Sequence, residues 1–413
     1  MARFCFRCIE CGDEYHEDPQ RLVCTRCAAK QAPGGTIRGV LEVVLKALPA
    51  TWPRFRPSDR EFLYAFLPVT DEGALPPLPV GDTPLIEAPR LRHELEMPNL
   101  YLKDDTRNPS GSTKDRASLL VVAKAVEYGC NTVATASTGN AASALAAVAA
   151  AAGLRAVVLV PESVPAAKLT QMLSYGATVI PVEGTYDQAF ELCIAACDRF
   201  GWYNRSTALN PFTIEGKKTA AIEIAAAMAP DIPDAVLVPT GDGVISAAIA
   251  KGFRDLEEAG LISTRPRLVV VQPEGSSAIV RALRSGAGEA QAMPDATSVA
   301  DSLTVEMPRN AIGCLAEVRA SGGGGVAVPD DAILESIPRL AGATGVFAEP
   351  AAAAALAGLE AALEEGLVDR DERVVLMITG GGLKDVDAAA RAVPTPDPVE
   401  PSLDAIAERI LSS

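Results

Sequence analysis

One lysine occupies a position where its amine can become reactive. Lys114 follows a flexible NPSGST turn at 108–113 and precedes an apolar helical pattern over 117–126. An amine at the positive end of a helix, close to other positive charge, loses its proton more readily, and a nucleophilic lysine needs this property. An ordinary solvated lysine shows the same local pattern, so Lys114 needs support from other motifs.

A second candidate loop joins a predicted strand at 132–136 to an alanine-rich helix that begins at Asn140. Its residues Ser137, Thr138 and Gly139 place backbone N–H groups at the helix N-terminus, where a carboxylate or phosphate binds. The side-chain amide of Asn140 can donate to an oxygen on a ring. A simple helix cap is the alternative interpretation.

Two glycine-rich loops follow other predicted strands. The PTGDGVI loop at 239–245 opens a helix, and its glycines let the backbone approach a phosphate; the candidate residues are Gly241, Asp242, Gly243, Val244 and Ile245. This loop lacks the lysine of a Walker motif and the third glycine of a dinucleotide fingerprint. After the last predicted strand, Thr379 begins a TGGG turn that offers a hydroxyl to a planar ligand, although a tight structural turn has a similar sequence.

The composition excludes several function classes. The 413 residues include 37 basic and 53 acidic side chains, a net charge of −16, and only two histidines, His16 and His93. Such acidity disfavours broad contact with nucleic acid or an anionic membrane, because these surfaces need clustered Lys and Arg. So few histidines disfavour a histidine-centred hydrolase. The most apolar stretch, 141–160, is interrupted by Gly153 and Arg155, so we expect no membrane span. The first twenty residues carry charges and lack a long apolar stretch, so we expect no leader peptide and, with reduced thiols, a cytoplasmic location.

Five of the nine cysteines lie in the first 27 residues. Two CxxC pairs, separated by twelve residues, have the form of zinc knuckles, because such pairs direct two thiolates at one tetrahedral ion. Cys5 is a spare thiol that could replace one of the four, and unrelated buried or surface cysteines are the alternative. We expect a structural zinc site whose ligands are Cys8, Cys11, Cys24 and Cys27.

Short β-branched runs alternate with helical patterns between residues 80 and 390, which predicts an α/β fold with parallel sheets flanked by helices and ligands at the strand ends. We expect a zinc-ribbon-like segment at 1–30, a connecting arm at 31–80, the main α/β region at 81–390 and a tail at 391–413 with one amphipathic helix. The predicted strands are 132–136, 156–160, 177–182, 235–239, 268–272 and 374–378, and helices are expected from residues 140, 164, 186, 244 and 276.

Together, an activated lysine, an anion-binding loop, a glycine-rich phosphate loop and a hydroxyl-bearing turn supply what a pyridoxal phosphate site needs. In the order of these motifs and in their residues, the chain resembles the threonine synthase family of pyridoxal-phosphate enzymes, which have the two-domain fold type II (tryptophan synthase β-like). The resemblance implies that 81–390 is the catalytic region, with a smaller subdomain at about 115–210. The matching stretches are NPSGSTKDRAS (108–118), ASTGNAAS (136–143), NPFTIEGKKTAAIEI (210–224), PTGDGVI (239–245), GVFAEPAAAAALAGL (345–359) and TGGGLKD (379–385).

The resemblance also implies a role for each loop. Lys114 would form the Schiff base with pyridoxal phosphate and later move protons, while Asn140 would bond the ring oxygen O3′. Residues 241–245 would hold the phosphate and Thr379 would face the pyridine nitrogen. The loop of Ser137, Thr138, Gly139 and Asn140 would hold the carboxylate of a small amino-acid substrate. Asp242 must then point its carboxylate away from the phosphate.

Three positions depart from the pattern of family members that act on O-phosphohomoserine. Ala141 stands where a threonine is common, Ala208 where an Asn-Ser pair is usual, and Thr213 where an arginine is usual. Arg205 or Lys217 could replace that arginine. The first expectation is a threonine synthase, and the alternatives are a β-eliminating or β-replacing enzyme (an ammonia-lyase or a cysteate-synthase-like enzyme acting on phosphoserine, serine, threonine or diaminopropionate) or a non-catalytic binding or scaffold protein. The resemblance also suggests a homodimer, and we expect no regulation by S-adenosylmethionine.

Overall fold

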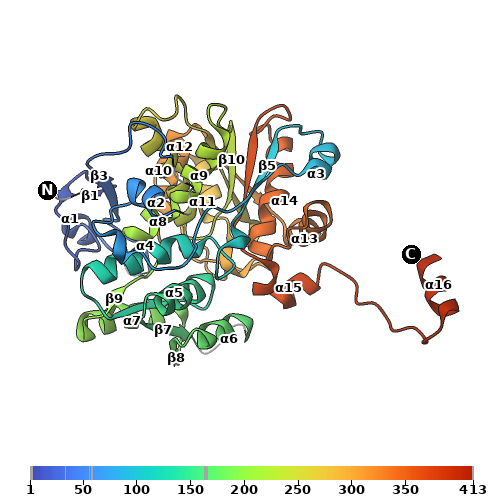
Figure 1. Ribbon diagram of the computed structural model, residues 1–413, viewed down its shortest axis with the longest axis horizontal. Coiled ribbons are helices and arrows are strands. Elements are labelled where there is room, and N and C mark those ends of the chain that lie inside the picture. The colour runs from blue at the N-terminus through green and yellow to red at the C-terminus, as the bar shows by residue number, and fades with distance from the viewer. Residues whose placement is uncertain (1–2, 33, 55, 57–58, 162–165, 412–413) are drawn as a thin grey trace.

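The largest of the three β-sheets that the described residues form lies at the centre of the molecule (Figure 1). The computed structural model describes residues 3–411 except 33, 55, 57–58 and 162–165. In this sheet only the short first strand is antiparallel, and the last strand of the chain lies between two earlier ones. The strand order is β12 (Gly324–Val328), β11 (Arg267–Pro273), β10 (Ala235–Pro239), β13 (Val374–Ile378), β5 (Leu100–Asp104) and β4 (Leu85–Ile86).

Helices cover both faces of this sheet, which explains why its strands are continuous apolar runs and do not alternate with polar residues. One face packs on α3 (Pro89–Glu94), α13 (Asp330–Thr344) and α14 (Pro350–Glu364). The other face packs on α9 (Thr219–Met228), α10 (Val244–Glu258), α11 (Ala278–Ser285) and α12 (Ala311–Ala320). Short 3-10 turns, η2 (Asp105–Arg107), η3 (Glu274–Ser276), η4 (Asp301–Leu303) and η5 (Gly382–Lys384), follow strands or join helices.

A smaller, fully parallel sheet lies beside the large one, at the bottom of Figure 1. Its strand order is β8 (Thr178–Val182), β7 (Arg155–Pro161), β6 (Thr132–Ala136) and β9 (Tyr203–Asn204). Its helices are α4 (Lys114–Glu127), α5 (Asn140–Ala151), α6 (Ala166–Ser174) and α7 (Tyr186–Phe200). The short α8 (Phe212–Lys217) packs on α4 and α10 and so joins the two sheets.

The N-terminal residues form a third, antiparallel sheet of β2 (Glu14–Tyr15), β1 (Phe4–Cys8) and β3 (Leu41–Leu45), followed by α2 (Arg60–Phe66) and η1 (Glu72–Ala74). Phe4 and Phe6 pack against Phe212 of α8 at ring-centroid distances of 5.7 and 5.6 Å, which anchors this sheet to the main body. A turn of helix, α1 (Thr25–Ala28), lies between β2 and β3. The chain ends with α15 (Val386–Ala390), an extended segment and α16 (Leu403–Leu411), which lies away from the body in Figure 1.

The structure confirms the predicted α/β class and the parallel sheets. The strands predicted at 132–136, 235–239 and 374–378 coincide with β6, β10 and β13, and the helices predicted from 140, 186 and 244 begin there. The prediction missed β5 and β12, and the helix predicted from 276 begins at Ala278 after a 3-10 turn. The predicted start of a helix at Val164 lies outside the described residues. Among the residues described, no helix has the length and apolarity to cross a membrane.

Candidate active site

A cavity of about 640 Å³ lies at the carboxyl ends of strands from both parallel sheets. Loops that follow β6, β10 and β13 supply much of its lining, as expected for a ligand site in an open parallel sheet. The structure therefore brings together loops that lie far apart in the sequence. All the residues predicted for cofactor and substrate line this cavity: Lys114, Ser137, Thr138, Gly139, Asn140, Gly241, Asp242, Gly243, Val244, Ile245 and Thr379.

Lys114 is the first residue of α4, where the helix begins at the cavity wall. The backbone N–H of Thr113 donates to the carbonyl oxygen of Thr379 at 2.9 Å, so the lysine and the hydroxyl-bearing turn are tied together. Burial lowers the pKa of Lys114 to about 8, while the charge of Glu349 opposes that shift. An amine with this pKa exchanges its proton readily near neutral pH, as a nucleophile or base requires.

The glycine-rich loop directs unpaired donors into the cavity. Within the described part of the chain, nothing accepts a hydrogen bond from the backbone N–H groups of residues 241–245, and these groups lie at the N-terminus of α10. Gly243 has φ +82°, and a Cβ there would lie 2.7 Å from the Cβ of Cys314, so the turn requires glycine. Free N–H groups and a helix dipole together form an anion site.

Asp242 lies inside this loop but its carboxylate is directed at the protein backbone. Its Oδ1 accepts a hydrogen bond from the backbone N–H of Arg309 at 3.1 Å, and the N–H of Asn310 donates to the Asp242 carbonyl at 2.9 Å. Burial raises the pKa of Asp242, because it disfavours the charged form. Both effects limit repulsion between this carboxyl and an anion on the loop.

The loop at 137–140 has some groups that are hydrogen-bonded within the protein and some backbone N–H groups that are free. The hydroxyl of Ser137 accepts from the N–H of Gly139 at 3.1 Å, and the Ser137 N–H donates to Leu159, so these groups hold the loop in shape. No described residue accepts from the backbone N–H groups of Thr138 and Asn140. These two N–H groups are therefore the free donors of the loop.

Two buried cations beside Lys114 have few partners. Lys217, on α8, lines the cavity with 1% of its surface exposed, and its Nζ donates to the carbonyl oxygen of Thr213 at 3.1 Å. Arg205 is fully buried; its Nε donates to Ser118 at 3.3 Å, and neither terminal guanidinium nitrogen has a partner among the described residues. A buried charge without a partner is costly, so Lys217, which lines the cavity, is suited to receive an anion, and the charge of Arg205 behind the cavity wall favours the same anion.

Burial perturbs both cations, and neighbouring positive charge perturbs Lys217 further. Burial, followed by the charges of Arg205 and Lys114, places the pKa of Lys217 well below its usual range. Burial also lowers the pKa of Arg205 to about 10. A negative group bound at Lys217 would offset this repulsion and favour the protonated amine.

The three positions that depart from the family pattern offer no charge to the cavity. Ala141 lines the cavity without a polar side chain, and Ala208 is buried. The hydroxyl of Thr213 donates to the carbonyl oxygen of Asn210 at 2.8 Å, so it is occupied within its own turn.

Several cavity residues were not singled out from the sequence. Glu349 lies in a stretch that matches the family, but its carboxylate carried no separate signal; Tyr186, Arg309 and residues 301–307 belong to no motif. The N-terminal segment also reaches the cavity: Gly34 lines it, and Thr36 donates to the carbonyl oxygen of Arg309 at 3.1 Å. These contacts join distant segments, so only the folded chain shows them.

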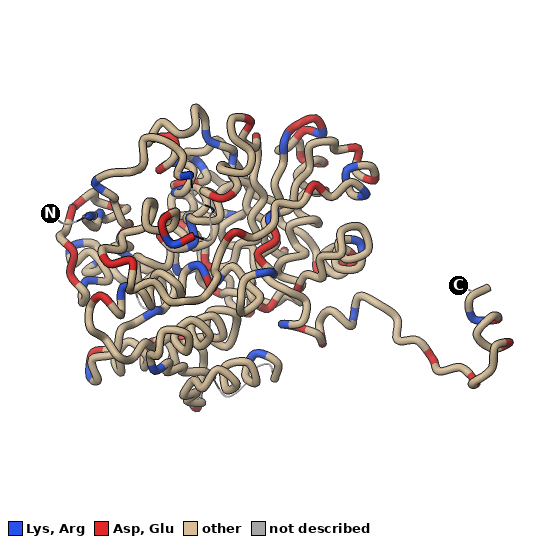
Figure 2. Tube along the Cα trace, in the orientation of Figure 1, with Lys and Arg blue, Asp and Glu red and all other residues tan. Residues whose placement is uncertain are grey.

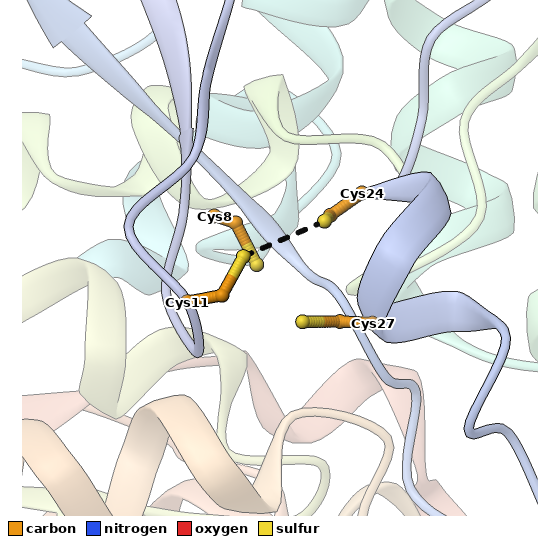
Figure 3. A group of neighbouring side chains, drawn as sticks. All are labelled: Cys8, Cys11, Cys24 and Cys27. Atoms are coloured by element: carbon orange, nitrogen blue, oxygen red, sulfur yellow. Dashed lines mark hydrogen bonds between the residues drawn. The ribbon is translucent and has the colours of Figure 1, made fainter.

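Four cysteines converge between the end of β1 and the short helix α1 (Figure 3). Their sulfur atoms lie within 4.8 Å of one another, and the Sγ atoms of Cys11 and Cys24 are 3.7 Å apart. Zinc–sulfur bonds of about 2.3 Å imply a sulfur–sulfur edge of about 3.8 Å in a tetrahedron, so the group fits a metal of that kind. Cys5 lies outside the group. The predicted ligands Cys8, Cys11, Cys24 and Cys27 are thus close enough to bind one ion.

Comparison with known proteins agrees with this geometry. The family model described as "Pyridoxal-phosphate dependent enzyme" matches residues 77–380. The threonine synthases of Methanocaldococcus jannaschii and Methanosarcina acetivorans are 37% and 36% identical to the chain, each over 98% of both sequences. Among solved structures, a threonine deaminase from T.th. superposes with a TM-score of 0.62 and 27% identity, covering 72% of this chain and 92% of that one. The chain therefore belongs to the pyridoxal-phosphate dependent enzymes and, within them, to the threonine synthase family.

Proposed function

We propose that the chain is a threonine synthase, a lyase that converts O-phosphohomoserine and water into L-threonine and phosphate. The observation that carries this proposal is a buried pair of cations outside the glycine-rich loop: Lys217, which lines the cavity, and Arg205, whose charge acts on Lys217 and whose terminal nitrogens have no partner among the described residues. If the cofactor phosphate occupies the glycine-rich loop, the cation pair remains for a second anion, and a phosphorylated substrate supplies one. The threonine synthases that match the chain over nearly its whole length support the same activity.

The described residues fit pyridoxal phosphate. Lys114 offers a cavity-lining amine with a lowered pKa, the loop at 241–245 offers unpaired N–H groups, and Thr379 offers a hydroxyl. We assign Lys114 to the cofactor aldehyde, the loop to its phosphate, Asn140 to its ring oxygen and Thr379 to its ring nitrogen. When bound, the cofactor supplies an electron sink that stabilises negative charge next to the substrate amine.

The chain's own residues then orient the substrate and move its protons. The free N–H groups of Thr138 and Asn140 receive the substrate carboxylate, with the hydroxyl of Ser137 holding the loop in shape. Lys217 receives the distal phosphate, with the charge of the buried Arg205 behind it, and this contact fixes the opposite end of the molecule. Lys114, whose pKa is about 8, takes and returns the protons of the carbons between these ends.

A second candidate is a β-eliminating or β-replacing enzyme of the same family. It is favoured by Thr213, whose hydroxyl is occupied by Asn210, and by Ala208, which has no side-chain donor. With fewer contacts to a distal phosphate, phosphoserine, serine, threonine or diaminopropionate become alternative substrates. The ammonia-lyase from Rhizomucor miehei shares the fold, with a TM-score of 0.64 at 21% identity.

A substrate panel tests the two candidates. The cofactor-loaded protein is incubated with O-phosphohomoserine, O-phosphoserine, threonine, serine and diaminopropionate, and phosphate, threonine, ammonia and keto acid are measured. We expect phosphate and threonine to appear in equal amounts from O-phosphohomoserine, and no product from Lys114→Ala. Ammonia or keto acid from the other substrates, with no turnover of O-phosphohomoserine, would refute the first proposal and support the second. A wild-type protein that binds no cofactor would support a binding or scaffold role.

We also infer the partners, the oligomeric state, the location and the domain bounds of the protein. Lys and Arg are interspersed with Asp and Glu along the chain in Figure 2 and the net charge is −16, so we expect no nucleic acid to bind. We expect a homodimer from the family resemblance and a cytoplasmic location from the free thiols, and we assign the four cysteines to a structural zinc ion. We assign the catalytic unit to 81–390, with the smaller subdomain at about 115–210. S-adenosylmethionine should leave the rate unchanged.

A further inference from the structure

The buried carboxylate of Glu349 has an unusual position. It is the residue directly before α14, where a side chain commonly caps the helix, yet its carboxylate makes no capping hydrogen bond. The side chain is 2% exposed and lines the cavity. Its Oε1 instead accepts a hydrogen bond from Nδ2 of Asn140 at 2.7 Å, across a sequence separation of 209 residues.

The backbone around Glu349 is built to keep this carboxylate in place. Its N–H donates to the carbonyl oxygen of Gly380 at 3.0 Å, and Ala348 forms a β-bridge with Gly381. A Cβ on Gly380 would collide with Oε1 of Glu349 and would lie 3.3 Å from Nδ2 of Asn140. A side chain at 380 would therefore displace the carboxylate from its contact with Asn140.

A carboxylate contact also determines which way the Asn140 amide faces. An ionised carboxylate only accepts hydrogen bonds, so Nδ2 must face Glu349 and Oδ1 must face away. Oδ1 is indeed buried without a partner among the described residues. One N–H of Nδ2 is occupied by Glu349, and the second remains for a ligand in the cavity.

The charge of Glu349 acts on lysines from three elements that surround it. Burial raises the pKa of Glu349, and the charges of Lys168 on α6, Lys384 on η5 and Lys114 on α4 oppose that shift. In return, Glu349 is the largest influence that keeps the pKa of Lys114 from falling below about 8. The structure contains no direct ion pair between Glu349 and Lys114 among the described residues, so the coupling acts through space.

We propose that Glu349 is a positioning residue: its carboxylate fixes the Asn140 amide in the cavity and places a negative charge within electrostatic reach of Lys114. This inference rests on the proposed cofactor site, in which Lys114 and Asn140 hold pyridoxal phosphate. Glu349 makes no contact with the reacting atoms in this assignment. Its two effects are separable, since Gln can still accept a hydrogen bond from Asn140 but carries no charge.

The test compares Glu349→Gln, Glu349→Ala and Asn140→Ala with the control Glu364→Gln, which makes the same change at the exposed far end of α14. In cofactor-free protein, the reactivity of Lys114 toward an amine-modifying reagent is followed against pH by peptide mass spectrometry. We expect the apparent pKa of Lys114 to fall by about one pH unit in both Glu349 variants, as expected for loss of a nearby opposite charge.

The second measurement is the affinity for pyridoxal phosphate, read from its lysine-dependent visible absorbance. Glu349→Gln should stay within about threefold of wild type, whereas Glu349→Ala should weaken binding about tenfold, as Asn140→Ala does, because one hydrogen bond to a charged group is lost. An unchanged Lys114 pKa in Glu349→Gln, or wild-type affinity in Glu349→Ala, would overturn the inference. Absence of the visible band from wild-type protein would instead overturn the proposed cofactor site, so the two failures are distinguishable.

Discussion

Replacement of Lys217 by methionine tests the proposed substrate-anion site most directly. The substitution keeps the length of a buried side chain and removes its charge. A hydrogen bond to a charged group contributes about 1.5–3 kcal/mol, and each 1.4 kcal/mol corresponds to about tenfold in affinity. We therefore expect KM for O-phosphohomoserine to rise by about 10-fold to about 150-fold, with a smaller change in kcat, in a continuous assay of phosphate release.

The same substitution should not destabilise the protein. Burial and the charges of Arg205 and Lys114 already disfavour the protonated amine, so its removal relieves repulsion. We expect the midpoint of thermal unfolding to stay the same or rise. The exposed Lys46 provides the matched control, and Lys46→Met should leave KM unchanged.

The proposed role of Lys217 also predicts how KM for O-phosphohomoserine changes with pH. An anion binds the protonated amine, and the pKa of Lys217 lies well below its usual range without a ligand. Below that ligand-free pKa no proton is taken up on binding; above it each binding event takes up a proton, so KM rises with pH by up to about tenfold per pH unit. This rise should disappear in Lys217→Met.

Binding of a ligand without phosphate separates the two anion sites. Threonine carries no phosphate, so Lys217→Met should leave its spectral titration unchanged, and the affinity for pyridoxal phosphate should also be unchanged. An equal loss for threonine and O-phosphohomoserine, or a weakened affinity for the cofactor, would refute the assignment of Lys217 to the substrate phosphate.

Three other perturbations follow from the structure. Metal analysis should find one zinc ion per chain, and Cys24→Ser should lower both the zinc content and the midpoint of thermal unfolding; a metal-free wild type contradicts the site. Asp242→Asn keeps an acceptor for the backbone and removes the charge next to the glycine-rich loop, so a cofactor titration should show tighter binding, and weaker binding would count against a phosphate there. Arg116→Met leaves the buried carboxylate of Asp105 without its ion-pair partner and that of Glu223 with Lys103 alone. Denaturant unfolding should show a loss of about 3–5 kcal/mol, whereas an unchanged midpoint would show that the network is not stabilising.

The strand–loop–helix units could be predicted because their signals are local. The loop at 239–245 follows an apolar run and contains the glycines that its turn requires, so the end of β10 and the start of α10 agree with the structure. In contrast, β5 was missed because the polar residues Lys103 and Asp104 interrupt its apolar pattern, although both are buried. Hydrophobic periodicity does not detect a strand whose carboxyl-terminal residues are polar.

β12 was missed for a different reason. It begins with two glycines, and a Cβ on Gly325 would lie 2.7 Å from a methyl group of Val270 on the neighbouring strand. Glycine at this position lets β12 pack closely against β11 and α11. In the sequence alone, however, the glycine run indicates a loop. The contact of Glu349 with Asn140, and the electrostatic coupling of Lys217 with Arg205, join separate motifs, so only tertiary structure reveals them.

The central position of β13 determines when the enzyme can complete its fold. Because β13 lies between β10 and β5, a nascent chain that has not reached Val374 carries two unpaired strand edges in the middle of its largest sheet. The smaller sheet, whose strands end by Asn204, meets no such delay. A truncation within β13 therefore leaves two parts of the large sheet with edges open to pairing with other chains. It also removes the Thr379 carbonyl to which the N–H of Thr113 donates at the start of α4.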